Sequence, residues 1–284
     1  MATPIDGEAK LSATDHPASP TNRKLKILML HGYTQSGPSF HAKTRALEKI
    51  LEKQISSRGN ASCLPGYLGG LQLIYPTAPF RLSTQEIPGF LSGSEKTDED
   101  IDRWAWWTRE KDCDKYKGLE QGLATIADVI RANDGIDGVI GFSQGAAAAA
   151  LVASLLEPGR RQIFDQVHEE DDQTLAFPKE WYDLNSMVPN GLKFAVAYSG
   201  FQPSHPAYRA FFEPKIQTPT LHFIGSLDTV LDEARSKALV EKCVLEKRKL
   251  VFHPGGHFVP NDKRMVSILV AFILECMAER TNSN

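Results

Sequence analysis

A serine lies between two glycines at the end of an apolar stretch, in the sequence Gly141-Phe142-Ser143-Gln144-Gly145, and five alanines follow directly at 146–150. This G-x-S-x-G pattern is typical of a nucleophile elbow, a sharp turn from strand to helix that lifts a serine hydroxyl clear of a sheet. The turn strains the serine backbone, and its two flanking positions have room only for glycine. We therefore predict a buried strand, an elbow at Ser143 and a helix beginning near Gln144, whose free N–H groups would face developing negative charge.

Apolar strands alternate with amphipathic helices along most of the chain. Besides the elbow, the pattern predicts strands at 24–30, 71–75, 192–198, 220–224 and 250–252, and helices at 40–55, 115–133, 233–245 and 263–279. Repeated strand–helix units form a mainly parallel central sheet with helices on both faces. A length of 284 residues with 42% hydrophobic residues suits one large α/β domain, which we place at 23–281.

Three stretches depart from this alternation. Residues 1–22 carry three prolines among polar residues and no apolar core, which predicts a disordered tail rather than a signal peptide. A long irregular region with three tryptophans ends near Asp114, and loops of that length are usually functional or mobile. The stretch 160–190 contains the acidic run 169–172 and reads as a surface excursion. It is either a partial cap over the site or a solvated loop, and the loop is favoured.

Composition excludes several classes of function. The net charge of −3 does not provide the excess of positive charge that is typical of proteins that bind nucleic acid or an anionic membrane. The four cysteines, Cys63, Cys113, Cys243 and Cys276, have neither C-x-x-C nor zinc-finger spacing, so we expect free thiols in a reducing compartment. The longest apolar run, 268–274, is far too short for a membrane span. These features lead us to expect a soluble cytoplasmic protein.

Reactive side chains follow several of the predicted strands. Ser143 ends the elbow strand, Asp228 follows the strand at 220–224, and His257 follows the strand at 250–252. Functional groups of such sheets gather where the strands end at their carboxyl edge. The order serine, acid, histidine is the one expected of an α/β-hydrolase triad. We therefore predict Ser143, Asp228 and His257 as the catalytic residues.

Each partner of the serine has a rival. Asp228 could instead be a turn residue or the cap of the helix that begins near 233, for which Asp232 is a competing candidate. We favour Asp228 as the acid because it lies closer to the end of its strand. His253 and His222 compete with His257. His222 lies inside a predicted strand, where a core histidine is the ordinary explanation, and His253 closes its strand. His257 lies beyond two glycines on a loop that is free to reach Ser143, so we favour it.

The first strand ends in His31-Gly32-Tyr33, a turn suited to the second half of an oxyanion hole. His31 would order the turn, and the backbone N–H groups of Tyr33 and Gln144 would bind the oxyanion. Aromatic residues at Trp106, Trp107 and Phe201 are candidates for binding an apolar acyl group. Packing in the core is an equally good explanation for any single one of them.

Several motifs together resemble a known family. They are His31-Gly32-Tyr33, Tyr75-Pro76-Thr77-Ala78-Pro79, Trp106-Trp107, Gly141-Phe142-Ser143-Gln144-Gly145, Ser199-Gly200-Phe201, Asp228-Thr229 and His253-Pro254-Gly255-Gly256-His257. In this order they resemble the FSH family of eukaryotic serine hydrolases, within the α/β-hydrolase superfamily. The resemblance implies the α/β-hydrolase fold and assigns Ser143, Asp228 and His257 as the triad. It also implies kinship with acyl-protein thioesterases and carboxylesterases.

The expected chemistry is hydrolysis of a small-molecule carboxylic ester or acyl thioester through an acyl-enzyme, with no metal or organic cofactor required. The resemblance further suggests an acyl-carrier protein or polyketide synthase as a partner. A non-catalytic protein that uses the same fold to bind a small ligand or partner is the alternative from another class. A serine peptidase or lipase would use the same triad, although no long hydrophobic lid is visible.

Overall fold

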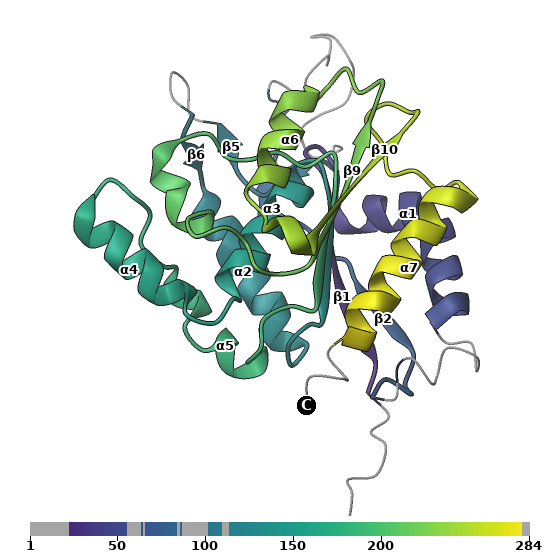
Figure 1. The fold of residues 1–284 in the computed structure, drawn as a ribbon. Coiled ribbons are helices and arrows are strands. Elements are labelled where there is room, and N and C mark those ends of the chain that lie inside the picture. Colours follow the sequence, from purple (N-terminus) through teal and green to yellow (C-terminus); the bar gives the residue numbers. More distant parts are fainter. Residues whose placement is uncertain are drawn as a thin grey trace, which may run out of the picture.

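The computed structural model describes residues 23–55, 64, 66–83, 86, 102–109 and 114–279 (Figure 1). The predicted tail at 1–22 lies outside these residues, as do Cys63 and Cys113. Cys243 and Cys276 are buried, and neither forms a disulfide within the described residues. None of the described helices combines the length and the apolar character needed to cross a membrane.

A six-stranded sheet forms the centre of the molecule, in the order β10-β9-β8-β7-β1-β2. Its strands are β1 (Leu25–Leu30), β2 (Leu71–Ile74), β7 (Gly138–Phe142), β8 (Phe194–Tyr198), β9 (Thr220–Gly225) and β10 (Arg248–His253). Every neighbouring pair is parallel. Of the four inner strands, β7, β8 and β9 are buried along their whole length, which is why their sequences are nearly continuous apolar runs. The predicted parallel sheet is confirmed.

Helices cover both faces of this sheet (Figure 1). The helices are α1 (Gly37–Ile55), α2 (Leu119–Ala132), α3 (Gln144–Leu155), α4 (Arg160–Glu170), α5 (Leu184–Met187), α6 (Glu233–Glu241) and α7 (Lys263–Glu279). On one face α1 and α7 pack beside each other over one apolar cluster. On the other face α2, α3 and α6 bury a second cluster against the sheet. The sheet therefore separates two hydrophobic cores.

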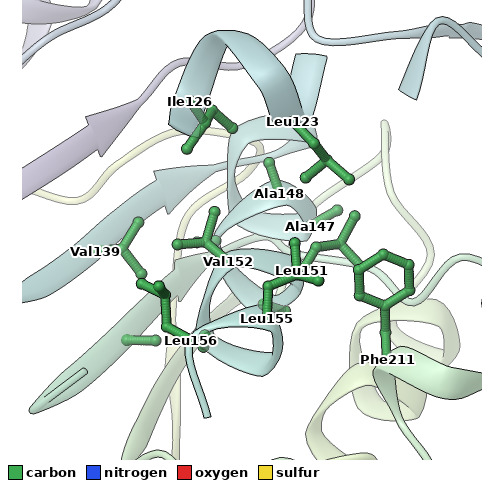
Figure 2. Close-up of a cluster of buried hydrophobic side chains, with 14 of the residues drawn as sticks. Leu123, Ile126, Val139, Ala147, Ala148, Leu151, Val152, Leu155, Leu156 and Phe211 are labelled. Carbon is green, nitrogen blue, oxygen red and sulfur yellow. The ribbon is translucent and has the colours of Figure 1, made fainter. Parts of the chain in front are cut away.

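Every residue of α3 is buried. Its alanines bring the helix backbone close to β7 and β8, and its larger side chains Leu151 and Leu155 meet Leu123 of α2 and Phe211 (Figure 2). Small side chains on a helix permit this close approach, and the larger ones fill the remaining space at the density of a close-packed interior. The elbow helix is therefore held firmly within the second core.

The stretch 160–190 differs from the favoured expectation of a solvated loop. It contains α4, the 3₁₀ turn η3 (Lys179–Trp181) and α5. Phe164, Trp181 and Leu184 are fully buried in the second core, with Phe164 edge-on to Phe211 at 4.8 Å between ring centroids. Isolated large apolar residues thus anchor a segment whose acidic run and prolines are typical of a surface loop. This packing, which no periodic pattern signals, explains the difference.

Two short hairpins stand in the region between β2 and α2, which the sequence presents as irregular. β3 (Phe80–Arg81) pairs with β4 (Trp104–Ala105), and β5 (Thr108–Arg109) pairs with β6 (Tyr116–Lys117), both antiparallel. Strands of two residues are too short for alternation to reveal them. β6 also delays the start of α2 to Leu119.

Candidate active site

The turn from β7 to α3 has the geometry of a nucleophile elbow. Ser143 has φ 53° and ψ −115°, a backbone conformation that residues other than glycine rarely adopt. A Cβ atom at Gly141 would lie 2.0 Å from the carbonyl oxygen of Gly145, and one at Gly145 would lie 2.1 Å from that of Leu30. No larger residue fits at either position without moving a backbone. The predicted reason for the two glycines is confirmed.

Ser143, His257 and Asp228 form one continuous chain of hydrogen bonds. His257 Nε2 lies 2.9 Å from Ser143 Oγ, and His257 Nδ1 lies 2.7 Å from Asp228 Oδ2. A carboxylate only accepts hydrogen bonds, so Nδ1 carries the proton and Nε2 is left to accept from the serine hydroxyl. The structure therefore brings together the three side chains that the sequence predicts as catalytic.

Asp228 is held on both carboxylate oxygens. While Oδ2 faces His257, Oδ1 accepts the N–H groups of Val230 at 2.9 Å and Leu231 at 3.0 Å. Burial alone would raise the pKa of Asp228, but the hydrogen bond from His257 and those from the two backbone N–H groups outweigh it. The pKa of Asp228 therefore lies below its usual value, and the carboxylate stays ionised.

Two loops are joined so that Asp228 and His257 meet. The N–H of Ser226 donates to the carbonyl of His253 at 2.9 Å, and the N–H of Leu227 donates to that of Gly255 at 3.0 Å. On the other side of His257, the Phe142 ring lies 4.9 Å away between centroids. These contacts leave the imidazole ring little freedom to turn away from Ser143.

The rival residues have other roles. Asp232 caps α6 by accepting the N–H of Ala234 at 2.6 Å. His222 is a buried core histidine on β9, 3.6 Å from the Cys243 thiol, and burial lowers its pKa to about 4. His253 ends β10 as a buried residue, and burial also lowers its pKa. Among the described residues, His257 alone hydrogen-bonds the Ser143 hydroxyl.

His31 fixes the loop after β1. The N–H of Ala78 donates to His31 Nε2 at 3.0 Å, so the proton is on Nδ1, which donates to the Gly32 carbonyl at 2.8 Å. The carbonyl of His31 accepts the indole N–H of Trp106 at 2.9 Å. Burial lowers the pKa of His31 to about 4, which keeps the ring neutral in this network. The expected ordering role of His31 agrees with this geometry.

Gln144 contributes a side chain as well as a backbone. Its Oε1 accepts the N–H of Trp106 at 2.9 Å, and its Nε2 donates to the carbonyl of Trp107 at 2.8 Å. This buried amide ties the elbow to the residues between β4 and β5. The sequence predicts a role only for the backbone of Gln144, because no local pattern indicates the two distant partners of its side chain. Within the part of the chain that is described, the backbone N–H groups of Tyr33 and Gln144 have no protein acceptor.

A cavity of about 430 Å³ opens beside Ser143. Its walls combine aromatic and aliphatic side chains with a few charged ones. The lining residues are Tyr33, Glu86, Trp107, Arg109, Tyr116, Ser143, Gln144, Phe201, Val230, Leu231, Arg235 and His257. Trp107 and Phe201 thus lie where the sequence predicts them. In the described ranges, no residue of 160–190 lines this cavity, and no three His, Cys, Asp or Glu side chains gather as a metal site would require.

The position of Trp106 differs from the expectation that it binds the substrate. Its side chain is fully buried, its ring lies 5.1 Å from the His31 ring between centroids, and it does not line the cavity. Trp106 and Trp107 lie between β4 and β5, where the Trp106 indole bonds the His31 carbonyl and the Trp107 ring stacks on Tyr116, so the two side chains occupy different spaces. Tyr116, Arg109 and Arg235, which do line it, are absent from the sequence prediction because they come from a two-strand hairpin and from α6.

The family model described as "Serine hydrolase (FSH1)" matches residues 20–268. The protein named "Family of serine hydrolases 3" from Saccharomyces cerevisiae is 31% identical over 259 residues, 87% of this chain and 82% of that one. "Esterase OVCA2" from Danio rerio is 28% identical over 249 residues, 83% of this chain and 90% of that one. A "Dihydrofolate reductase" from Schizosaccharomyces pombe is 30% identical over 244 residues, which cover 84% of this chain and only 44% of that longer protein.

Solved structures agree on the fold. Acyl-protein thioesterase 2 from Zea mays superposes with a TM-score of 0.51 at 18% identity, covering 92% of this chain and 96% of that one. This likeness identifies the α/β-hydrolase fold. The family match spans the sheet, the elbow and the loops that carry Asp228 and His257. The chain belongs to the FSH serine hydrolase family.

Proposed function

We propose that the protein is a serine esterase that cleaves carboxylic ester or acyl-thioester bonds at Ser143. The observation that carries this proposal is the unbroken hydrogen-bond chain from Ser143 Oγ through His257 to Asp228, at the wall of a 430 Å³ cavity. Membership of a serine hydrolase family, with relatives named as esterases, supports the reaction class. The thioester part of the proposal is suggested by the name of the Zea mays protein with a similar fold, an acyl-protein thioesterase.

The first half-reaction acylates the serine. Ser143 Oγ attacks the substrate carbonyl carbon while its proton moves to His257 Nε2. Asp228 holds Nδ1–H and stabilises the imidazolium, since its carboxylate stays ionised. The N–H groups of Tyr33 and Gln144 bind the oxygen that becomes negatively charged. When the tetrahedral intermediate collapses, the leaving alkoxide or thiolate takes the proton from His257.

The second half-reaction frees the enzyme. A water molecule gives one proton to His257 Nε2 as its oxygen attacks the acyl carbon, and the same backbone donors bind the second oxyanion. Collapse breaks the bond to Ser143 Oγ, which takes the proton back, and the carboxylic acid leaves. The groups of this chain and one water thus complete the cycle. An acyl-carrier protein or polyketide synthase as the source of the acyl group remains a prediction from the family resemblance.

Covalent labelling tests the nucleophile. A fluorophosphonate probe should label the wild-type protein and fail to label Ser143→Ala, while Ser226→Ala, an exposed serine two residues before Asp228, keeps full labelling. Turnover of p-nitrophenyl butyrate should follow the same order. Labelling that persists in folded Ser143→Ala would overturn the assignment of the nucleophile. A wild-type protein that neither labels nor turns over esters would favour the ligand-binding alternative.

A further inference from the structure

Two arginines that have no carboxylate partner among the described residues line the cavity that holds Ser143. Arg109 lies on β5 and Arg235 lies in the first turn of α6, both at exposed positions. In the described part of the chain, neither side chain forms an ion pair or a hydrogen bond. Several other arginines do have acidic partners: Arg131 with Asp128 and Asp183, Arg160 with Glu157, and Arg209 with Glu170. Within the described residues, no acceptor occupies the guanidinium donors of this pair.

Arg235 is held in place by an aromatic ring. Its guanidinium carbon lies 4.9 Å from the centroid of the Phe201 ring, and Phe201 itself lines the cavity. A cation–π contact of this kind uses the charge of the guanidinium and none of its N–H donors. The ring therefore holds Arg235 beside the cavity without using the donors that recognise carboxylate or phosphate.

Both arginines act on the same wall of the cavity. Burial raises the pKa of Tyr116 to about 12, and the positive charges of Arg109 and Arg235 oppose this rise, so both lie within electrostatic reach of the Tyr116 hydroxyl. Asp114 acts on the same hydroxyl with opposite sign, but it accepts a hydrogen bond from Ser204 and does not line the cavity.

The acidic residue of the lining belongs to another wall. Glu86 accepts the N–H and hydroxyl of Ser83, and burial together with the Glu86 charge raises the pKa of Tyr33. Among the described lining residues, Glu86 thus acts on Tyr33, whereas the two arginines act on Tyr116.

We propose that Arg109 and Arg235 form a subsite for an anionic group of the substrate, a carboxylate or phosphate located away from the scissile carbonyl. Planar guanidinium groups bind both anions through paired charge-assisted hydrogen bonds. The anion belongs either to the acyl chain, as in a half-ester of a dicarboxylic acid, or to the leaving group, as in a phosphate-bearing thiol. This inference rests on the proposed esterase function, because it names the substrate class of that same site.

Matched substrate pairs distinguish the two sources. Mono-p-nitrophenyl glutarate and p-nitrophenyl valerate differ only by a carboxylate in place of a terminal methyl group. The S-butyryl thioesters of 4′-phosphopantetheine and of pantetheine differ only by the phosphate of the leaving group. We expect the wild-type enzyme to prefer the anionic member of one pair, mainly through a lower KM. The pair that shows the preference identifies which side of the substrate carries the anion.

Substitution of each arginine then tests the residues. Arg109→Gln and Arg235→Gln should each lower the ratio of kcat/KM for the anionic substrate over the neutral one by about tenfold, the loss of one charge-assisted contact. Arg235→Lys, which keeps the charge, should recover part of that ratio. The matched control is Arg264→Gln, an exposed position in the first turn of α7, which covers the other face of the sheet, and it should leave the ratio unchanged.

Two results would overturn the subsite. One is a wild-type enzyme that hydrolyses both neutral substrates but prefers neither anionic partner. The other is an anionic preference that survives both glutamine substitutions. In either case the esterase proposal stands, because neutral esters are still cleaved. A wild-type protein that cleaves none of the four substrates and does not react with the fluorophosphonate probe contradicts the esterase proposal itself.

Discussion

Asp228 shows how a single side chain can be fixed before it is used. Its two oxygens are divided between His257 and the N–H groups of Val230 and Leu231, so the carboxylate cannot rotate without losing hydrogen bonds on both sides. Its low pKa keeps the charge in place at neutral pH. In the proposed mechanism this charge selects the His257 tautomer with the proton on Nδ1.

Asp228→Asn should lower kcat for p-nitrophenyl butyrate by roughly 10³- to 10⁴-fold, since an amide in this position favours the wrong tautomer. The measurement is steady-state kinetics at pH 7.5, with a thermal melt to show that the variant is folded. Asp232→Asn is the matched control, because asparagine also caps helices and Asp232 contacts α6 rather than His257. A kcat for Asp228→Asn within tenfold of wild type would contradict the role of Asp228.

Single residues differ in how far their sequence reveals them. The elbow glycines are required by space, and Ser143, Asp228 and His257 follow strand ends, so a reader of the sequence can place all five. The side-chain direction of Trp106 could not be predicted, because it depends on where a two-residue strand begins and ends. The two hydrogen bonds of the Gln144 amide reach residues about forty positions away, and such pairing follows only from the folded chain.

At the scale of elements, the junction after α3 depends on a buried ion pair. Glu157 and Arg160 lie 2.5 Å apart with almost no exposure. Glu157 Oε1 also accepts the N–H groups of Gln217 and Thr218, and Arg160 donates to the carbonyl of Pro214. The pair thus joins the start of α4 to the segment that leads into β9.

Arg160→Met should lower the free energy of unfolding by about 3–5 kcal/mol, because it leaves the Glu157 carboxylate buried without its cation. Urea denaturation at pH 7 measures this loss. Arg161→Met provides the control, since that side chain is 46% exposed, 3.9 Å from Asp165 and 3.8 Å from the centroid of the Tyr182 ring, and the loss of these exposed contacts should cost about 1 kcal/mol. Equal losses in the two variants would show that the buried pair does not stabilise the fold.

The hairpin strand β6 also divides two cavities. The Tyr116 ring stacks between Trp107 at 5.0 Å and Tyr208 at 5.2 Å, and Tyr116 lines both the cavity of Ser143 and a second one of about 270 Å³. Within the proposed reaction, this stack would limit the length of the acyl chain.

Tyr116→Ala should therefore join the two cavities. The variant should raise kcat/KM for p-nitrophenyl octanoate relative to the butyrate ester by about tenfold, which corresponds to the free energy of burying a few additional CH₂ groups. Tyr116→Phe keeps the ring and should retain the wild-type ratio. If the alanine variant shows the same chain-length profile as wild type, the stack does not limit the acyl chain.

Elements with a strong period were predictable, and those without one were not. The helix at 263–279 and the six sheet strands follow from apolar patterning, although the strands are buried along their length only inside the sheet, and the edge strands β2 and β10 are partly exposed. The segment 160–190 is anchored by separated aromatic residues instead, and the hairpins β3–β4 and β5–β6 are too short to carry a pattern. In these places tertiary packing, rather than local preference, decides the structure.

For the molecule as a whole, buried histidines make stability depend on pH. Burial lowers the pKa of His31 and of His222 to about 4, and the nearby charge of Arg248 adds to the effect on His222. The unfolded chain binds protons near the ordinary histidine pKa, whereas the folded chain does not. Stability is therefore fully present above about pH 6.5 and falls as the pH decreases from 6.5 toward 4.

His222→Gln should reduce this dependence. Between pH 7 and pH 5 the free energy of unfolding should fall by about 2 kcal/mol more in the wild-type protein than in the variant, as expected for one histidine whose pKa is lowered to this extent. Urea denaturation of both proteins at the two pH values gives the change in the free energy of unfolding for each. The two changes can be compared whatever the stability of the variant at pH 7. Parallel losses in the two proteins would contradict the assigned role of His222.

The alanines of α3 have a consequence for directed evolution of this chain. Where a helix meets a sheet through methyl groups alone, a larger side chain can be admitted only by shifting the whole helix, and the backbone N–H of Gln144 would shift with it. Random libraries that include 146–150 would therefore yield many inactive clones for each useful one. Diversity placed instead at Tyr116, Val230 and Arg235 would alter the cavity while the helix that carries the reactive serine stays in place.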